Sequence, residues 1–157
     1  MEEEVISVDD SFSLHGLTKA ISESIVRHVC SDFLILRLST LLGPFMRPNS
    51  LIKMIREEHC SLTLAGDSIL NYVSYEDTLN FLKIAVEKNL KGIFNVLSTE
   101  NIRLDEIAAR ILKKKVIFGS YHYEVGHIDT DKIKGIMPSF SKTSSDAIGH
   151  FLKERRE

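Results

Sequence analysis

The sequence predicts a mixed α/β protein whose sheet is at least partly parallel. Stretches with the apolar spacing of helices alternate along the chain with short stretches typical of strands, which favours an α/β sheet over a helix bundle or a β-sandwich. One strand candidate, 33–38, is apolar almost throughout, as expected of a strand covered on both faces. With 157 residues, 43% of them hydrophobic, the chain can bury a core as a single domain.

The first half of the chain is predicted to begin with a helix and to continue through a buried strand into a shorter helix. Apolar side chains recur every three or four positions over 14–29, which predicts a helix with one apolar face. The strand 33–38 follows, and a turn at 41–44 closes it. Position 49 or 50 can cap a short apolar helix. Two further strands are expected at 61–65 and 70–75.

The second half is predicted to alternate in the same way. A longer helix is indicated at 76–88, with acidic residues in its first turn and Gly92 just beyond its end, where a left-handed residue is often required. The next elements are expected as a strand at 93–97, a helix at 103–113 and extended chain at 116–118. The final elements are expected as a strand at 121–125, a short helix near Asp131 and a last helix from about Ser144.

Charge and composition exclude several classes of function. The 20 Lys and Arg residues nearly balance the 22 Asp and Glu residues, so the chain lacks the positive field that binds nucleic acid or an anionic membrane. No apolar run approaches the roughly 20 residues that cross a bilayer, and the acidic start at 1–4 is unlike a signal peptide. Cys30 and Cys60 form no CxxC pair. We therefore expect a cytoplasmic protein without membrane or nucleic-acid partners.

The glycines exclude the usual nucleotide-binding loops from these 157 residues. No two of the eight glycines lie within six positions of each other, so neither GxGxxG nor GxxxxGK[ST] is present. Both motifs depend on closely spaced glycines, because these let backbone N–H groups approach a phosphate at a helix N-terminus.

Several segments, taken in order, resemble a known family. The segment 14–20, with His15, Gly16 and Lys19, opens a helix, and the apolar strand 34–38 follows it. The sequence is similar here to the extended short-chain dehydrogenase/reductase family, which includes NAD-dependent sugar-nucleotide epimerases and dehydratases and carries Tyr-Gly-x-[Ser/Thr]-Lys before such a strand. Later matching stretches, in the same order as in the family, are 43–44, 66–77, 92–96 and 129–133, followed by Pro138, Phe140 and the helix from Ser144.

The resemblance implies the late part of a Rossmann-type parallel sheet joined to the family's small α/β substrate-binding lobe. It implies a single truncated unit over 1–157, in which 14–45 is a remnant of the Rossmann core and 46–157 is the lobe with the C-terminal helices. The family's N-terminal half, with its glycine-rich loop and a catalytic Ser or Thr, has no counterpart in this sequence.

The same resemblance points to two candidate catalytic residues. Lys19 matches the lysine that holds the nicotinamide ribose and lowers the pKa of the catalytic tyrosine, so it is the candidate for both catalysis and cofactor binding. His15 stands where the family has that tyrosine. An imidazole at i, i+4 from Lys19 lies on the same helix face and can exchange a proton. A histidine without a chemical role is favoured instead, because a neighbouring ammonium disfavours its charged form.

Substrate contacts are indicated at three positions. Arg47 can offer a cation to a phosphate from its loop, while Asn71 and Tyr75 can face a ligand from the strand region. By resemblance the ligand is a nucleotide sugar and the cofactor NAD or NADP. No metal site is predicted, since His122 and Glu124 share one face of their predicted strand, His127 lies on the other and no fourth ligand is apparent.

These observations favour a fragment or truncated homologue of an NAD(P)-dependent sugar-nucleotide epimerase, dehydratase or reductase that is inactive alone. One alternative is a non-catalytic binding or assembly subunit, which would form a homo-oligomer or pair with a separate dinucleotide-binding chain, because apolar faces that the family buries would be exposed here. Another is an active oxidoreductase that uses His15 in place of the tyrosine.

Overall fold

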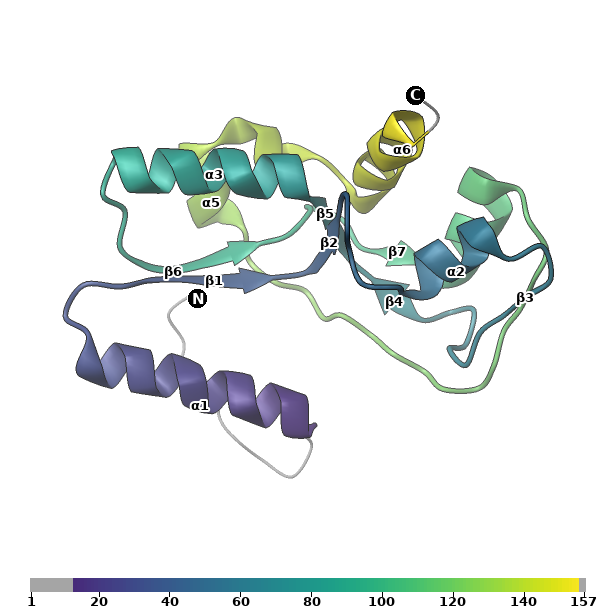
Figure 1. Cartoon of the computed structure of the whole chain (residues 1–157), viewed down its shortest axis with the longest axis horizontal. Coiled ribbons are helices and arrows are strands. Elements are labelled where there is room, and N and C mark those ends of the chain that lie inside the picture. The colour runs from purple at the N-terminus through teal and green to yellow at the C-terminus, as the bar shows by residue number, and fades with distance from the viewer. Residues whose placement is uncertain (1–12, 156–157) are drawn as a thin grey trace.

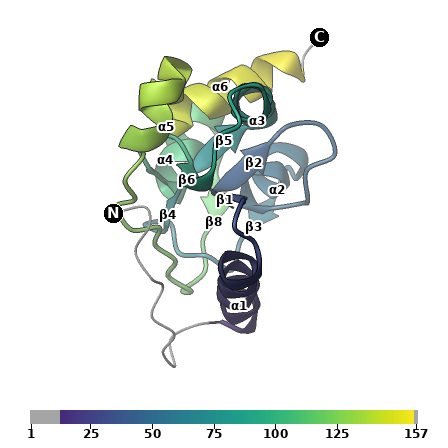
Figure 2. The same ribbon diagram turned by 90° about the vertical axis from the view of Figure 1, so that its left-hand side faces the viewer.

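The computed structural model describes residues 13–155, so the acidic start at 1–4 lies outside the described residues. Two parallel strands, β1 (Leu34–Leu38) and β6 (Gly92–Val96), form the centre of one half of the molecule (Figure 1). Helix α1 (Leu14–Val29) covers one face of this pair, and α3 (Tyr75–Glu87) and α5 (Asp131–Ile136) lie on the other face (Figure 2). The predicted parallel α/β arrangement is thus confirmed.

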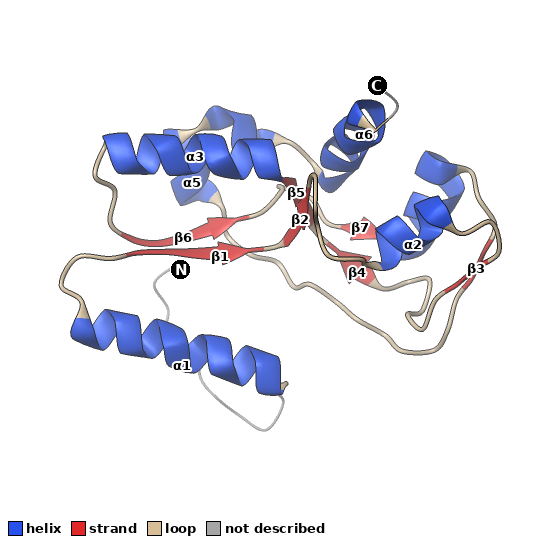
Figure 3. Ribbon diagram, in the orientation of Figure 1, coloured by secondary structure: helices blue, strands red, loops and turns tan. Residues whose placement is uncertain are grey.

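The other half of the molecule is a lobe built from very short strand pairs (Figure 3). Its parallel pairs are β2 (Thr40–Leu42) with β5 (Tyr72–Ser74) and β3 (Cys60–Ser61) with β8 (Val116–Ile117). Its antiparallel pair is β4 (Ile69–Leu70) with β7 (Ile102–Arg103). The helical elements of the lobe are α2 (Ser50–Arg56), α4 (Leu104–Glu106) with the π-helical η1 (Ile107–Leu112), and α6 (Ser144–Glu154), which follows the 3₁₀ turn η2 (Pro138–Ser141).

Each half has its own apolar cluster. Under α3, the ring of Phe81 lies 5.2 Å from that of Phe94 and 6.1 Å from that of Phe140, measured between ring centroids. In the lobe, α2 and η1 bury Leu51 and Ile107 completely. Burial of such side chains contributes about 1.5–3 kcal/mol each, so these clusters hold the short strands of the lobe in place. Among residues 13–155 no helix has the length and apolar character needed to cross a membrane.

The boundary between strand and helix near residue 75 differs from the prediction. The expected strand 70–75 is interrupted at Asn71, whose side chain bonds to other parts of the chain instead of pointing to solvent. Helix α3 begins at Tyr75 rather than at residue 76, because the hydroxyl of Ser74 caps it by accepting a hydrogen bond of 3.0 Å from the N–H of Asp77.

The end of α3 is closed by Asn89 and not by the predicted Gly92. Asn89 takes the left-handed conformation, with φ of 49°, and the N–H of Leu90 donates to the carbonyl of Ala85 at 2.8 Å. This is a Schellman arrangement, which satisfies the last carbonyls of the helix. Gly92 does have positive φ, at 95°, but there it turns the chain into β6.

Four other predicted elements are shorter or of another kind. The expected turn at 41–44 begins as strand β2, and the strand 61–65 is reduced to β3 plus a single bridge at Leu64. The stretch 121–125 forms isolated bridges to Leu64 and Ile69 but no strand. The expected helix 103–113 becomes β7, one turn of α4 and the wider η1.

Candidate ligand-binding site

A cleft of about 640 Å³ opens at the carboxyl ends of β1 and β6. Ligands of open α/β sheets bind outside the carboxyl ends of parallel strands, so this is the expected place for a site. Its lining comes from β1, β6, the residues that follow each strand, Asn71, and the irregular segment 123–129. The lining residues are Arg37, Leu38, Ser39, Thr40, Asn71, Asn95, Leu97, Tyr123, Val125, His127, Ile128 and Asp129.

Asn71 is the one predicted substrate residue that lines this cleft, but its side-chain amide is hydrogen-bonded to other residues of the chain. The side chain is 1% exposed. Its Nδ2 donates to the carbonyl of Ser98 and to Oδ1 of Asn101, each at 2.9 Å, and its Oδ1 accepts from the N–H of Ser98 at 3.0 Å. Asn71 therefore builds the floor of the cleft.

Arg37 places a guanidinium at the end of β1, beside the cleft. Its Nη2 lies 2.6 Å from Oε1 of Glu23, and its Nε lies 3.0 Å from Oε2, so the pair is bidentate. Glu23 belongs to α1, and the ion pair ties that helix to the sheet. The sequence analysis did not select Arg37, although a single charged residue inside an apolar strand was a usable signal.

Two asparagines bond to the segment 125–129, which forms one wall of the cleft. Asn95 of β6 is 5% exposed, and its Nδ2 donates to the carbonyl of Asp129 at 2.9 Å. Asn101 donates from Nδ2 to the carbonyl of Val125, also at 2.9 Å. Sequence reasoning missed both residues, because nothing in the chain order indicates that they contact a segment 24 or more positions away.

A second cleft of about 320 Å³ lies on the other side of this wall. Leu97, Val125, His127 and Ile128 line both clefts. Its further lining includes charged groups from the lobe, among them Arg103 and Glu106. The wall thus separates two adjacent hollows.

The structure does not bring His15 and Lys19 to either cleft. Both side chains are exposed on α1, His15 in its first turn and Lys19 one turn later. The helix starts there because Ser13 caps it, with its hydroxyl 3.1 Å from the N–H of Gly16. The roles of His15 and Lys19 therefore stay predictions that rest on the family pattern.

Arg47 and Tyr75, the other two predicted contacts, also lie outside the lining of both clefts. Arg47 is exposed in the loop between β2 and α2. Tyr75 packs on Gly43 so closely that a Cβ at position 43 would lie 2.2 Å from its Cδ2. Tyr75 therefore has a packing role, and Gly43 is required by this contact rather than by its backbone conformation.

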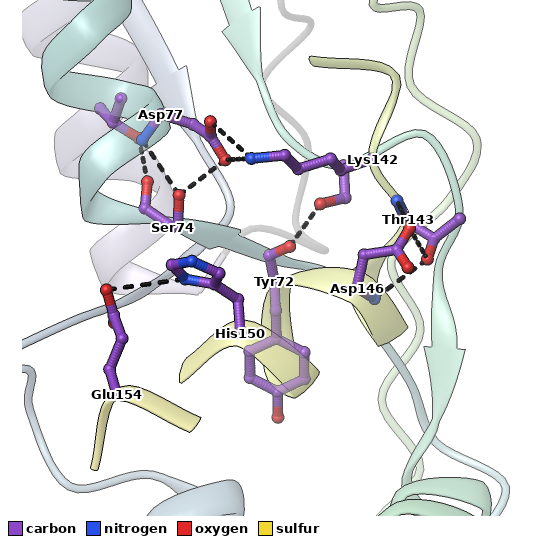
Figure 4. A network of polar contacts seen from close by, with 10 residues as sticks. Tyr72, Ser74, Asp77, Lys142, Thr143, Asp146, His150 and Glu154 are labelled. Atoms are coloured by element: carbon purple, nitrogen blue, oxygen red, sulfur yellow. Dashed lines mark hydrogen bonds and ion pairs between the residues drawn. The ribbon is translucent and has the colours of Figure 1, made fainter. Parts of the chain in front are cut away.

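A polar network joins the start of α3 to the segment before α6 (Figure 4). The carboxylate of Asp77, only 8% exposed, accepts from the Ser74 hydroxyl at 2.7 Å and pairs with Nζ of Lys142 at 3.0 Å. At the start of α6, Thr143 and Asp146 cap the helix reciprocally. The hydrogen bond from the Thr143 N–H holds the pKa of the Asp146 carboxyl below its ordinary value.

Three side chains near this network could offer ligands to a metal ion. The ligand atoms of Glu76, His150 and Glu154 all lie within 4.8 Å of one another, and all three residues are exposed. His150 and Glu154 are one turn apart on α6, with Nδ1 and Oε1 3.6 Å apart (Figure 4). Sequence reasoning did not find this group, because Glu76 comes from a different helix.

The sequence matches no protein-family model, and no curated protein gives a significant match. Solved structures are similar. Residues of this chain superpose on the dTDP-glucose 4,6-dehydratase of Bacillus anthracis in complex with NAD with a TM-score of 0.72 and 15% identity, covering 99% of this chain and 56% of that chain. This likeness shows that the chain shares the fold of part of that enzyme.

Two further structures of this fold show the same relation. The UDP-glucuronic acid 4-epimerase of Bacillus cereus, in complex with UDP-glucuronic acid and NAD, has a TM-score of 0.68 and 19% identity over 97% of this chain and 58% of its own. The enzyme WbmG of Bordetella bronchiseptica, in complex with NAD and UDP, has 0.66 and 15% over 91% and 50%. This chain therefore spans 50–58% of the length of these enzymes.

Proposed function

We propose that this chain is the substrate-side portion of an NAD(P)-dependent sugar-nucleotide epimerase, dehydratase or reductase and that it binds a nucleotide sugar in the cleft of about 640 Å³ at the ends of β1 and β6. The position of that cleft carries the proposal, since it lies outside the carboxyl ends of parallel strands in a fold shared with such enzymes. Hydride transfer requires a dinucleotide-binding portion besides these residues.

The described residues do not fit the pyrophosphate of a dinucleotide. A pyrophosphate is held by free backbone N–H groups at a helix N-terminus, close to glycines. Here the side chains of Ser74 and Thr143 cap α3 and α6, and the carboxylates of Asp77 and Asp146 lie in the first turns, where their charge repels a phosphate. Ser13 in turn occupies the N-terminus of α1 by accepting from the Gly16 N–H. We therefore derive no catalytic step through a cofactor.

The cleft proposal is tested by calorimetric titration with UDP, dTDP and UDP-glucose. Tyr123 lines the cleft and offers a ring on which a base can stack, whereas Tyr121 lines neither cleft. We expect saturable binding that Tyr123→Ala weakens and Tyr121→Ala leaves unchanged. Equal loss in both variants, or no binding to the wild type, would contradict the proposal.

The alternative of an active oxidoreductase is tested separately with NADH and NADPH. We expect no saturable change in cofactor fluorescence up to millimolar concentration. Lys83, on the exposed side of α3, supplies the control variant Lys83→Ala. Saturable binding that Lys19→Ala abolishes and Lys83→Ala preserves would favour the enzyme that uses His15 as its proton donor.

One observation favours the second candidate, a binding or assembly subunit. Helix α1 buries none of its residues, and Leu14 and Val29 are 78% and 73% exposed, with Ile21 and Ile25 at 49% and 57%. Such an apolar stripe is typically covered by a partner. Light scattering should then show self-association that Ile21→Lys and Ile25→Lys abolish. A chain that is monomeric at high concentration, and stays monomeric when a dinucleotide-binding chain is added, would exclude the binding or assembly subunit.

A further inference from the structure

The wall between the two clefts is a short irregular strap. We use this name for residues 126–128, which belong to no helix or strand. His127 and Ile128 line the larger cleft on one side and the smaller cleft on the other. The position of the strap therefore decides whether the two clefts are separate or continuous.

The strap is fastened at its two ends, and the amide of Asn101 also reaches its first residue, with Nδ2 3.5 Å from the carbonyl of Gly126. At one end Asn101 donates from Nδ2 to the carbonyl of Val125 at 2.9 Å, and at the other Asn95 donates to the carbonyl of Asp129 at 2.9 Å. Within the described part of the chain, the backbone N–H groups of His127 and Ile128 make no hydrogen bond. The N–H of Val125, just before the strap, donates to the carbonyl of Ile69 at 3.0 Å. Beyond that backbone bond, the conformation of the strap depends on two side-chain amides.

The two ends differ in how easily water can replace the amide. Asn95 lies in β6 with 5% of its surface exposed, so its bond is shielded. Asn101 is exposed, and solvent competes for the carbonyl of Val125. Gly126 follows immediately, and no atom lies within 4 Å of the place its Cβ would occupy, so the chain has room to turn there.

The side chain of Asn101 is itself held in place by Asn71. Its Oδ1 accepts from Nδ2 of the fully buried Asn71, on the floor of the cleft, at 2.9 Å. One side of the Asn101 amide is therefore fixed to the core while the other reaches the strap. The amide of Asn101 thus links Asn71, on the floor of the cleft, directly to the carbonyl of Val125 beside the strap.

We infer that Asn101 is a positioning residue of this site and latches the strap, which swings open at Gly126, beyond the fixed N–H of Val125, about the fixed end at Asp129. The inference rests on the proposed binding of a nucleotide sugar. The latched strap closes one side of the larger cleft and retains a ligand bound there. A released strap opens this side toward the smaller cleft.

The test uses Asn101→Asp, which keeps the shape and the acceptor for Asn71 but has no N–H to give to Val125. The matched control is Asn80→Asp, because Asn80 lies on α3 and lines neither cleft. Backbone ¹⁵N relaxation is measured on the ligand-free proteins. Order parameters of residues 126–128 should fall from the rigid range near about 0.85 to below about 0.6 in Asn101→Asp only.

Binding is measured on the same proteins with UDP-glucose. Loss of the latch should raise the dissociation rate about three- to tenfold, as expected for one net hydrogen bond, while the urea midpoint stays that of the control. Unchanged order parameters in Asn101→Asp would overturn the latch, whatever the binding result. A mobile strap with an unchanged dissociation rate would overturn its role in retention. Absence of binding to the wild type would instead refute the proposed function, and with it the role of the strap.

Discussion

Replacing Asn71 by alanine separates a structural role of this residue from the predicted contact with substrate. The change removes two buried hydrogen bonds to Ser98 and one part-buried hydrogen bond to Asn101. Each contributes a net 0.5–1.5 kcal/mol by mutational precedent, so the free energy of unfolding should fall by about 3 kcal/mol. Ser98 is only 5% exposed, so its freed N–H and carbonyl cannot turn to bulk water.

The assay is urea unfolding followed by circular dichroism. With a slope of about 2 kcal/mol per molar urea, the midpoint of Asn71→Ala should move down by about 1.5 M. The control Asn80→Ala, on α3 and away from this network, should stay within about 0.5 kcal/mol of the wild type.

The opposite result has a clear meaning. A variant that unfolds within about 0.5 kcal/mol of the wild type while losing affinity for UDP-glucose would refute the structural account. The amide of Asn71 would then serve a ligand, and the hydrogen bonds to Ser98 would contribute nothing measurable.

Three other predictions follow from single contacts. Gly43→Ala should destabilise the fold by about 1–3 kcal/mol, because the new methyl group collides with the ring of Tyr75. Gly149→Ala meets no atom within 4 Å inside α6 and should stabilise by up to about 1 kcal/mol, so equal urea midpoints for the two variants would contradict both accounts. Because Thr143 lowers the pKa of Asp146, the carboxylate stabilises the fold above about pH 4 and loses this effect as pH falls through that lowered pKa. Asp146→Asn should therefore lower the melting temperature at pH 7 but not in acid, and a difference from wild type that is the same at both pH values would disprove the linkage.

The layers of the fold were predictable because buried helices and strands show a recognisable pattern of apolar residues in the sequence. The apolar run that becomes β1 predicted a strand covered on both faces, and α1 and α3 lie on its two sides. The strands of the lobe, of two or three residues each, are too short to show such a pattern. Two-residue pairs such as β3 with β8 are held by the surrounding helices, so their own residues carry little β pattern.

The candidate site was harder to predict for a related reason. Its wall is fastened by carboxamides, and an asparagine in a sequence indicates a turn or cap as readily as a long-range hydrogen bond. Asn71 was selected from its place beside the strand, whereas Asn95 and Asn101 were not selected. Arg37 was the one site residue with a signal of its own, since a guanidinium inside an apolar strand needs a partner such as Glu23.

The attachment of α1 decides what its exposed residues can do. The helix buries no side chain completely, and its firmest described link to the sheet is the ion pair of Glu23 with Arg37. A partly exposed pair contributes on the order of 1 kcal/mol, too little to fix a 16-residue helix against the forces that act when a ligand binds. Lys19 can act on a cofactor only if its position is defined. Any catalytic role of Lys19 therefore requires that the apolar stripe of α1 be covered, which links the enzymatic and the assembly proposals to the same surface.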